Sequence, residues 1–159
     1  MSGIGPGHEA GAGTGGAPSG NEATRFHEWL RTRLSGKGYQ ELRVTPQMRP
    51  LRLAFLRPAG AIADARVIGV VDTAVTSNTP AEISEHLKSW FQTTQGSHRG
   101  GPGLLLLVCY NPSALFVDAV KKGSFYAGNV SVEVAAYDAI SGTHWLSRTS
   151  ECTSDVFDS

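Results

Sequence analysis

The sequence predicts a three-layer α/β domain with a mixed, mainly five-stranded sheet flanked by helices, in the order α-β-β-β-α-β-α-β. Residues 65–71 and 104–110 are continuous apolar runs of strand length, which is typical of strands covered on both faces. A capped amphipathic pattern over residues 79–95 separates these runs, so a helix should connect them as parallel strands. Alternating segments before the first run predict antiparallel strands in the same sheet.

The first half of the chain predicts one helix and two half-buried strands. The helix begins at Thr24, which can cap it, and ends at Gly36. Residues 40–45 and 51–57 alternate between apolar and polar side chains, as strands with one solvated face do. The helix carries apolar side chains at helical spacing, which are Phe26, Trp29, Leu30 and Leu34.

The second half of the chain predicts the centre of the sheet and its connecting helices. Thr79 and Glu82 form a capping box, which is the clearest helix start in the sequence. A short helix from Ser113 to about Lys122 follows the second apolar run. Residues 130–136 alternate as a further strand, and residues 143–147 can return as a short one. We expect the short helix to bury four apolar side chains, namely Leu115, Phe116, Ala119 and Val120.

Composition divides the chain into an arm, one domain and a tail. Residues 1–22 consist almost entirely of Gly, Ala, Ser, Pro and Thr, which cannot bury enough surface to offset the entropy of ordering. We therefore expect a disordered Gly-rich arm there and a single α/β domain over residues 23–148. Residues 149–159 are polar, and we expect a frayed tail.

Charge and composition exclude several classes of protein. The 159 residues carry 14 Lys and Arg against 14 Asp and Glu, and this zero net charge argues against a nucleic-acid partner. No apolar run approaches the roughly 20 residues of a transmembrane helix, and no secretion signal is recognisable. Two cysteines make neither a disulfide framework nor a Cys-rich zinc site. We expect a cytoplasmic protein with no transmembrane segment in this chain.

Polar side chains at the ends of the predicted parallel strands form the candidate site. Asp72, Asn111 and Asp138 each end a buried strand, and Ser113 begins the following helix. Because the carboxyl ends of parallel strands meet at one edge of a sheet, ligands tend to bind there. Two carboxylates and an amide could hold Mg²⁺ or Mn²⁺, or anchor a polar ligand.

Local structural roles explain the same residues without a ligand. Asn111 before Pro112 can cap a helix, Asp72 can open a turn, and Asp138 can close an Asx turn. This alternative requires no cofactor, and both interpretations stay open at the level of sequence.

The sequence offers no recognisable catalytic residue. Cys109 lies within a buried strand, where a thiol has a raised pKa, and Cys152 lies in the tail without a basic neighbour. His27 and His86 fall on the polar sides of helices, where we expect them to be solvated. No HExxH, CxxC or G-x-S-x-G motif is present.

The order of elements resembles the core of restriction-endonuclease-like folds. Nucleases with that fold place an acid on one strand and Glu-x-Lys on the next, so that carboxylates hold Mg²⁺. The comparable strands here, residues 51–57 and 64–68, contain no Glu-x-Lys. The resemblance therefore implies the topology without the nuclease chemistry.

Residues 24–145 also resemble the cytosolic N-terminal domain of some bacterial rhomboid-family intramembrane proteases. The likeness lies in residues 26–30, in the strand of residues 104–111 leading into a helix, and in residues 128–134. It implies a non-catalytic accessory or sensory domain, with divalent cations as one candidate signal, linked to a membrane protein. The family's catalytic serine and histidine lie on transmembrane helices, so no catalytic residue carries over to this chain.

The leading hypothesis is a non-catalytic accessory or regulatory domain that binds a partner protein, because no set of nucleophile, base and oxyanion donor can be assembled. The alternative is a sensor of divalent cations or polar ligands, or a degenerate metal-dependent nuclease-like domain. The alternative places its site at the carboxyl edge of the parallel strands, whereas partner binding requires an exposed apolar patch.

Overall fold

The structure, a computed structural model, describes residues 20–96 and 100–158. Within these residues, seven strands form one mixed sheet flanked by four α-helices. The strands are β1 (Gln40–Leu42), β2 (Leu51–Arg57), β3 (Arg66–Asp72), β4 (Gly101–Cys109), β5 (Phe125–Ala127), β6 (Val130–Asp138) and β7 (His144–Leu146). The helices are α1 (Gly20–Ser35), α2 (Pro80–Gln95), α3 (Ala114–Lys121) and α4 (Glu151–Phe157), with 3-10 turns η2 (Pro46–Met48) and η3 (Thr73–Val75).

Three parallel strands form the centre of the sheet. The strand order is β1-β2-β3-β4-β6-β5, and β7 also pairs with β6. β3, β4 and β6 are parallel to one another, whereas the remaining pairs are antiparallel. Asp72 is in register with Val108, and Cys109 with Asp138, so all three strands end at the same edge of the sheet. The predicted parallel pairing of the two apolar runs is confirmed.

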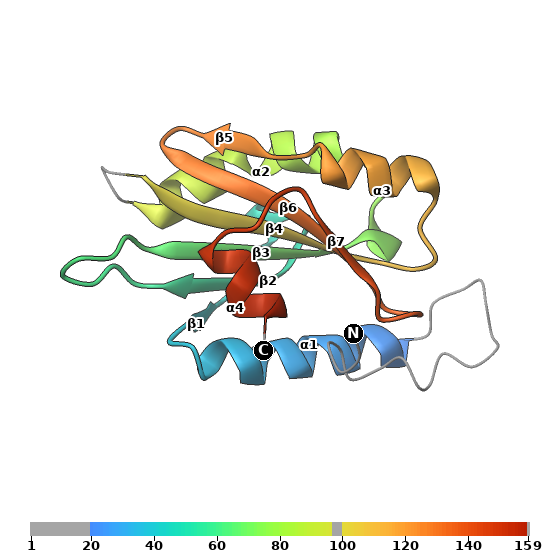
Figure 1. Ribbon diagram of the computed structural model, residues 1–159, viewed down its shortest axis with the longest axis horizontal. Coiled ribbons are helices and arrows are strands. Elements are labelled where there is room, and N and C mark those ends of the chain that lie inside the picture. The colour runs from blue at the N-terminus through green and yellow to red at the C-terminus, as the bar shows by residue number, and fades with distance from the viewer. Residues whose placement is uncertain (1–19, 97–99, 159) are drawn as a thin grey trace.

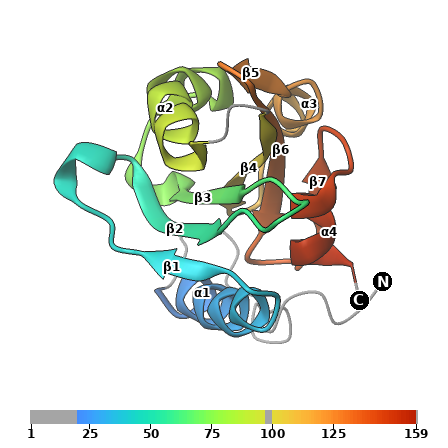
Figure 2. The same ribbon diagram turned by 90° about the vertical axis from the view of Figure 1, so that its left-hand side faces the viewer.

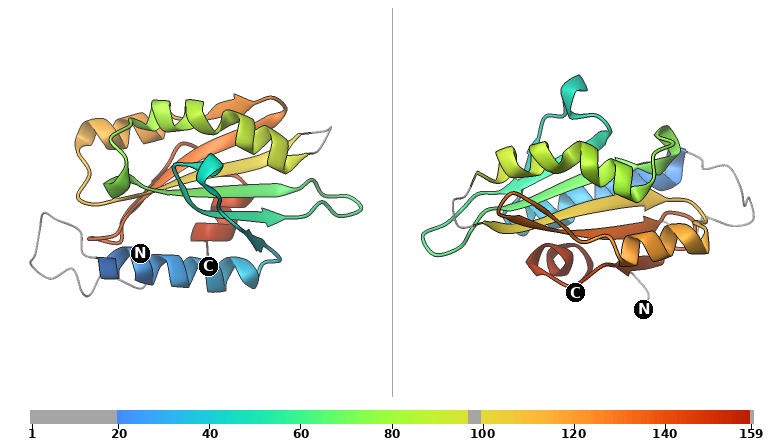
Figure 3. Two further views of the ribbon diagram at one scale, coloured as in Figure 1. Left: turned by 180° about the vertical axis from the view of Figure 1, so that it is seen from behind. Right: turned by 90° about the horizontal axis from the view of Figure 1, so that it is seen from above.

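The helices cover the sheet on both faces, which gives the three predicted layers. α1 and α4 pack on one face, while α2 and α3 pack on the other (Figures 1 and 2). Seen from above, α2 and α3 extend over the same side of the sheet (Figure 3). Alternate residues of each central strand therefore enter two separate apolar cores, since neighbouring side chains point to opposite faces. In the described residues, no helix combines the length and apolar character needed to cross a membrane.

The capping signals before α2 are realised as predicted. The Thr79 Oγ1 accepts a hydrogen bond from the Glu82 amide at 3.2 Å, and the Glu82 carboxylate accepts one from the Thr79 amide at 2.8 Å. At the other end, Gly96 adopts a left-handed conformation with φ of 64°, a conformation that favours glycine.

The sheet contains more strands than the five predicted. The additional pairings lie along β6, which β5 joins at residues 130–132 and β7 at residues 135–137. Each of these two strands has three residues, too few for a clear alternation of apolar and polar side chains. The predicted strand at residues 143–147 is therefore present in shorter form as β7, and β5 was missed.

The end of the chain differs from the expected frayed tail. Residues 151–157 form α4, in which Cys152 and Val156 are fully buried. Ser150 caps this helix and pairs with Thr153 in a capping box. At the other end of the domain, α1 begins at Gly20 rather than at Thr24. Of the arm predicted over residues 1–22, residues 20–22 belong to α1, and residues 1–19 lie outside the described residues.

Candidate functional site

A depression of about 540 Å³ lies at the carboxyl edge of the parallel strands. One wall is the segment that follows β3, and the other is the loop that leads from β4 into α3. Figure 1 shows that both segments lie at the same end of the sheet. This is the edge to which the sequence assigned ligand binding, since polar loop residues converge there in open α/β sheets. The lining residues are Thr73, Ala74, Thr76, Asn78, Cys109, Tyr110, Asn111, Pro112, Ser113 and Phe116.

The structure brings only two of the four predicted site residues into this depression. Asn111 and Ser113 line it, whereas Asp72 and Asp138 do not. Val71 belongs to the core under α2 and α3, so strand alternation directs Asp72 to the opposite face, toward α1. There the Asp72 carboxylate accepts hydrogen bonds from the Ala74 amide at 3.0 Å and the Tyr110 hydroxyl at 2.9 Å.

Asp138 is almost completely buried, on the α3 side of the sheet. One oxygen of its carboxylate accepts hydrogen bonds from the amides of Asn111 at 3.2 Å and Ile140 at 2.9 Å. The other oxygen accepts a hydrogen bond from the Ser141 hydroxyl at 2.9 Å. Asn111 has a φ of 50°, a left-handed conformation that asparagine tolerates better than most residues. Asp138 therefore holds the turn that presents Asn111 at the depression.

This arrangement does not fit a magnesium or manganese ion. The Asp72 and Asp138 carboxylates point to opposite faces of the sheet, and each already accepts hydrogen bonds from the surrounding loops. Across residues 20–96 and 100–158, no three His, Cys, Asp or Glu side chains gather closely enough to hold a metal ion. A hard cation needs several oxygen ligands on one centre.

Most hydroxyl groups in the depression already have partners within the chain. The Thr73 hydroxyl donates to the Val108 carbonyl oxygen at 2.9 Å, and the Thr76 hydroxyl accepts from the Asn78 amide at 3.2 Å. The Ser113 hydroxyl accepts from the Phe116 amide at 3.1 Å and so caps α3. These hydroxyls shape the walls rather than face a ligand.

Two side-chain amides in the depression lack the internal partners that the hydroxyl groups have. Those of Asn78 and Asn111 form no hydrogen bond with any residue that the structure describes. Each carries a donor and an acceptor, so each is available to a ligand.

Two exposed apolar side chains, here called the apolar borders, belong to chain neighbours of residues that line the depression. Val75 is 73% exposed on η3, and Leu115 is 83% exposed on the first turn of α3. Their chain neighbours Ala74, Thr76 and Phe116 line the depression itself. The prediction that Leu115 is buried is wrong, because the only fully buried side chain of this short helix is Val120 on its opposite side.

The depression lacks the side chains that catalyse acyl transfer or other group-transfer reactions. Its lining contains no histidine and no carboxylate. Burial, followed by the nearby Asp138 carboxylate, raises the pKa of the Cys109 thiol to about 12. The thiol is therefore protonated at neutral pH and a poor nucleophile.

His27 belongs to α1 and is only 4% exposed, contrary to the prediction of a solvated side chain. Its Nε2 atom has no hydrogen-bond partner among the residues that the structure describes. Burial and the positive charge of Arg52 lower the pKa of His27 to about 4, against the opposing influence of Asp72. The imidazole is therefore neutral at pH 7.

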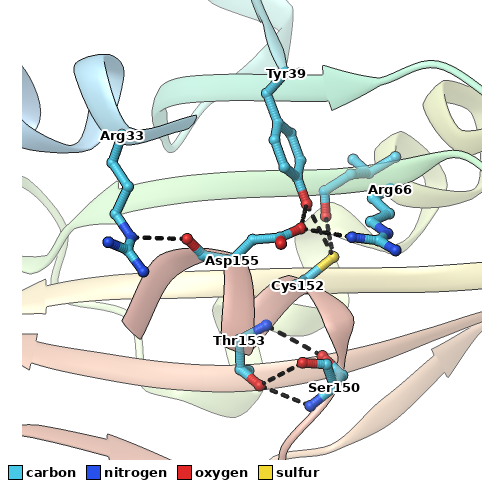
Figure 4. Close-up of polar contacts among 8 residues, drawn as sticks. Arg33, Tyr39, Arg66, Ser150, Cys152, Thr153 and Asp155 are labelled. Atoms are coloured by element: carbon cyan, nitrogen blue, oxygen red, sulfur yellow. Dashed lines mark hydrogen bonds and ion pairs between the residues drawn. The ribbon is translucent and has the colours of Figure 1, made fainter. Parts of the chain in front are cut away.

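The polar network around α4 lies toward the amino ends of the parallel strands (Figure 4). The Asp155 carboxylate accepts a hydrogen bond from the Tyr39 hydroxyl at 2.7 Å and forms an ion pair with Arg66 at 2.8 Å. The Arg33 Nε donates to the Asp155 carbonyl oxygen at 2.8 Å. The neighbouring Cys152 is fully buried rather than part of a frayed tail, and this burial raises the pKa of its thiol to about 12.

No family model matches the chain, and no curated protein or solved structure is significantly similar to it.

Proposed function

We propose that this chain is a non-catalytic accessory domain that binds a partner protein at the carboxyl edge of its parallel strands. The observation that carries the proposal is the exposure of Val75 and Leu115, whose chain neighbours line the two walls of one depression. Single exposed apolar residues are common on protein surfaces, but apolar side chains that flank a hollow are typical of interaction sites.

The chemistry of the lining supports binding rather than catalysis. The depression lacks a histidine and a carboxylate, and its one thiol is held protonated by burial. Asp72 and Asp138, which a metal-dependent reaction would use, serve the loops on opposite faces of the sheet. The resemblance of residues 24–145 to the rhomboid cytosolic domain is compatible with the same assignment, because those domains are non-catalytic.

Site-specific photo-crosslinking in the cells that make the protein tests this proposal. A photoreactive amino acid replaces Leu115 in one full-length variant and Ile62 in a matched control. Ile62 is 93% exposed but lies in the β2–β3 connection, just before β3 and therefore at the opposite end of the sheet.

We expect one defined protein to crosslink from position 115 and not from position 62. Its purified form should bind the Val75→Asp and Leu115→Asp variants at least about tenfold more weakly than wild type, because each change places a charge at the contact. Equal crosslinking from both positions, or affinity unaffected by either substitution, would overturn the proposal.

A further inference from the structure

We infer that the depression takes an uncharged, extended segment of the partner, whose main chain contacts Asn78 and Asn111 and whose apolar side chain packs on Phe116, next to the exposed Val75 and Leu115. This inference rests on the proposed function and adds the chemistry of the bound segment. Three properties of the depression support it: the charge of its lining, its free amides and its apolar borders.

The lining of the depression contains no charged side chain. The Asp72 and Asp138 carboxylates are not part of the lining, and they already accept hydrogen bonds from the Ala74 and Asn111 amides and from the Ser141 hydroxyl. A charged ligand group would lose water on entering and would find no opposite charge in the lining to compensate it. Electrostatic complementarity therefore favours an uncharged segment over an acidic or basic one.

The free amides of Asn78 and Asn111 select for exposed main chain. A carboxamide presents one acceptor and two donor hydrogens, which match the N–H and C=O groups of a peptide unit. In a helix, main-chain groups are already paired within the helix, whereas an extended segment leaves them available. Asn78 follows η3 and Asn111 follows β4, so the two amides come from opposite walls of the depression.

The apolar borders provide a place for one side chain of the segment. Phe116 lines the depression and is partly buried, while Val75 and Leu115 extend beside it into solvent. An apolar side chain that packs on Phe116 and its exposed neighbours removes apolar surface from water, which stabilises the complex in proportion to the area buried. The volume of about 540 Å³ falls within the range of roughly 300–1,000 Å³ that is usual for binding pockets.

Selection from a random-peptide display library tests the inference on the full chain. Each round of selection on the wild-type chain follows depletion on the Leu115→Asp variant, so the retained peptides depend on Leu115. The affinities of the enriched peptides, made synthetically, are then measured for wild type, Asn78→Asp and the control Ile62→Asp. Equal free energies of unfolding of these chains show that each variant is folded.

We expect uncharged peptides with one recurrent apolar position, bound about tenfold more weakly by Asn78→Asp and unchanged by Ile62→Asp. Asn78→Asp keeps the shape of the side chain, but it removes the donor and introduces a charge.

Enriched peptides with a charged motif, or with affinity indifferent to Asn78→Asp, would overturn this inference and leave the proposed function standing. If no peptide depends on Leu115 while a neutral small molecule does, the proposed function itself fails.

Discussion

The two ends of the parallel strands differ in how their polar groups are used. At the amino end, Asp155 on α4 pairs with Arg66 and accepts a hydrogen bond from Tyr39, so charges and hydroxyls meet within the chain. A hollow of about 520 Å³ there is lined partly by this same ion pair. At the carboxyl end, the depression has an uncharged lining, and the Asn78 and Asn111 amides are left without partners in the described part of the chain.

This difference indicates that the polar groups at the amino end stabilise the fold, whereas those at the carboxyl end form a binding surface. Polar groups that satisfy one another across distant segments fix those segments in place, and a ligand could bind there only by displacing them. Polar groups that remain free next to exposed apolar side chains contribute nothing to folding and are available to a partner. Substitutions at the amino end should therefore change stability, whereas those at the carboxyl end should change binding.

The largest expected effect is at the amino end. Asp155→Ala removes the partner of both Arg66 and Tyr39, which remain largely buried, so the free energy of unfolding should fall by about 3 kcal/mol. Urea denaturation measures it. The matched control is Glu85→Ala, which breaks an exposed ion pair with Lys88 and should cost less than about 0.5 kcal/mol. Equal losses in the two variants would contradict the role given to Asp155.

The next effect concerns the pH dependence of stability through His27. Its pKa is lowered to about 4 in the folded chain, against 6.5 as the usual value, so the unfolded chain binds more protons below pH 6.5. Stability should therefore decrease as pH falls, by about 2 kcal/mol between pH 7.5 and 5. His144, whose pKa burial also lowers, adds a change of the same sign.

The His27→Gln variant should lose most of this pH dependence, and denaturation curves at several pH values measure it. His86→Gln, a change at an exposed position on α2, should retain the wild-type dependence. A pH profile of His27→Gln identical to that of wild type would show that His27 is not buried in neutral form.

The two serine caps give a smaller effect, with one at each end of the sheet. Ser150 caps α4 at the amino end, and Ser113 caps α3 at the carboxyl end. Replacing either with alanine should cost about 1 kcal/mol, because each leaves a helix amide without its partner. Thermal unfolding measures both losses. If Ser113→Ala left stability unchanged but abolished binding, Ser113 would face the ligand directly.

The smallest expected effect on stability comes from the apolar borders of the depression. Val75→Asp and Leu115→Asp change exposed side chains, so the free energy of unfolding should remain within about 0.5 kcal/mol of wild type. Chemical denaturation of each variant measures this. A loss above about 1 kcal/mol would indicate that these side chains pack within the fold, and the comparison between the two ends would weaken.

The centre of the fold was predictable from local pattern. Residues 65–71 and 104–110 are apolar without interruption, and the capping box at Thr79 and Glu82 marks the start of the helix between them. Such signals depend on neighbouring residues alone, so they can be recognised in one sequence. These signals also locate the ends of the strands, and so they predict the edge of the sheet at which Asn111 and Ser113 lie.

Features that depend on distant contacts were not predictable. α4 has seven residues and is held by Tyr39 and Arg66, which lie 116 and 89 positions away from Asp155. A helix this short is not stable without such packing.

The helical phase of α1 did contain a signal for one missed residue. His27 stands four positions after Ala23 and three before Leu30, both buried, which places it on the apolar side of the helix. Its polar residue type led to the wrong prediction. Leu115 is the opposite case, because it is an apolar residue that is exposed. Its exposure depends on how α3 is oriented on the sheet.

An amide chemical-shift map of the isotopically labelled chain, titrated with a selected peptide, tests the central claim most directly. We expect the largest shifts in residues 73–78 and 111–116, around the depression at the carboxyl edge. Shifts concentrated instead in residues 149–155, at the amino end of the sheet, would contradict it.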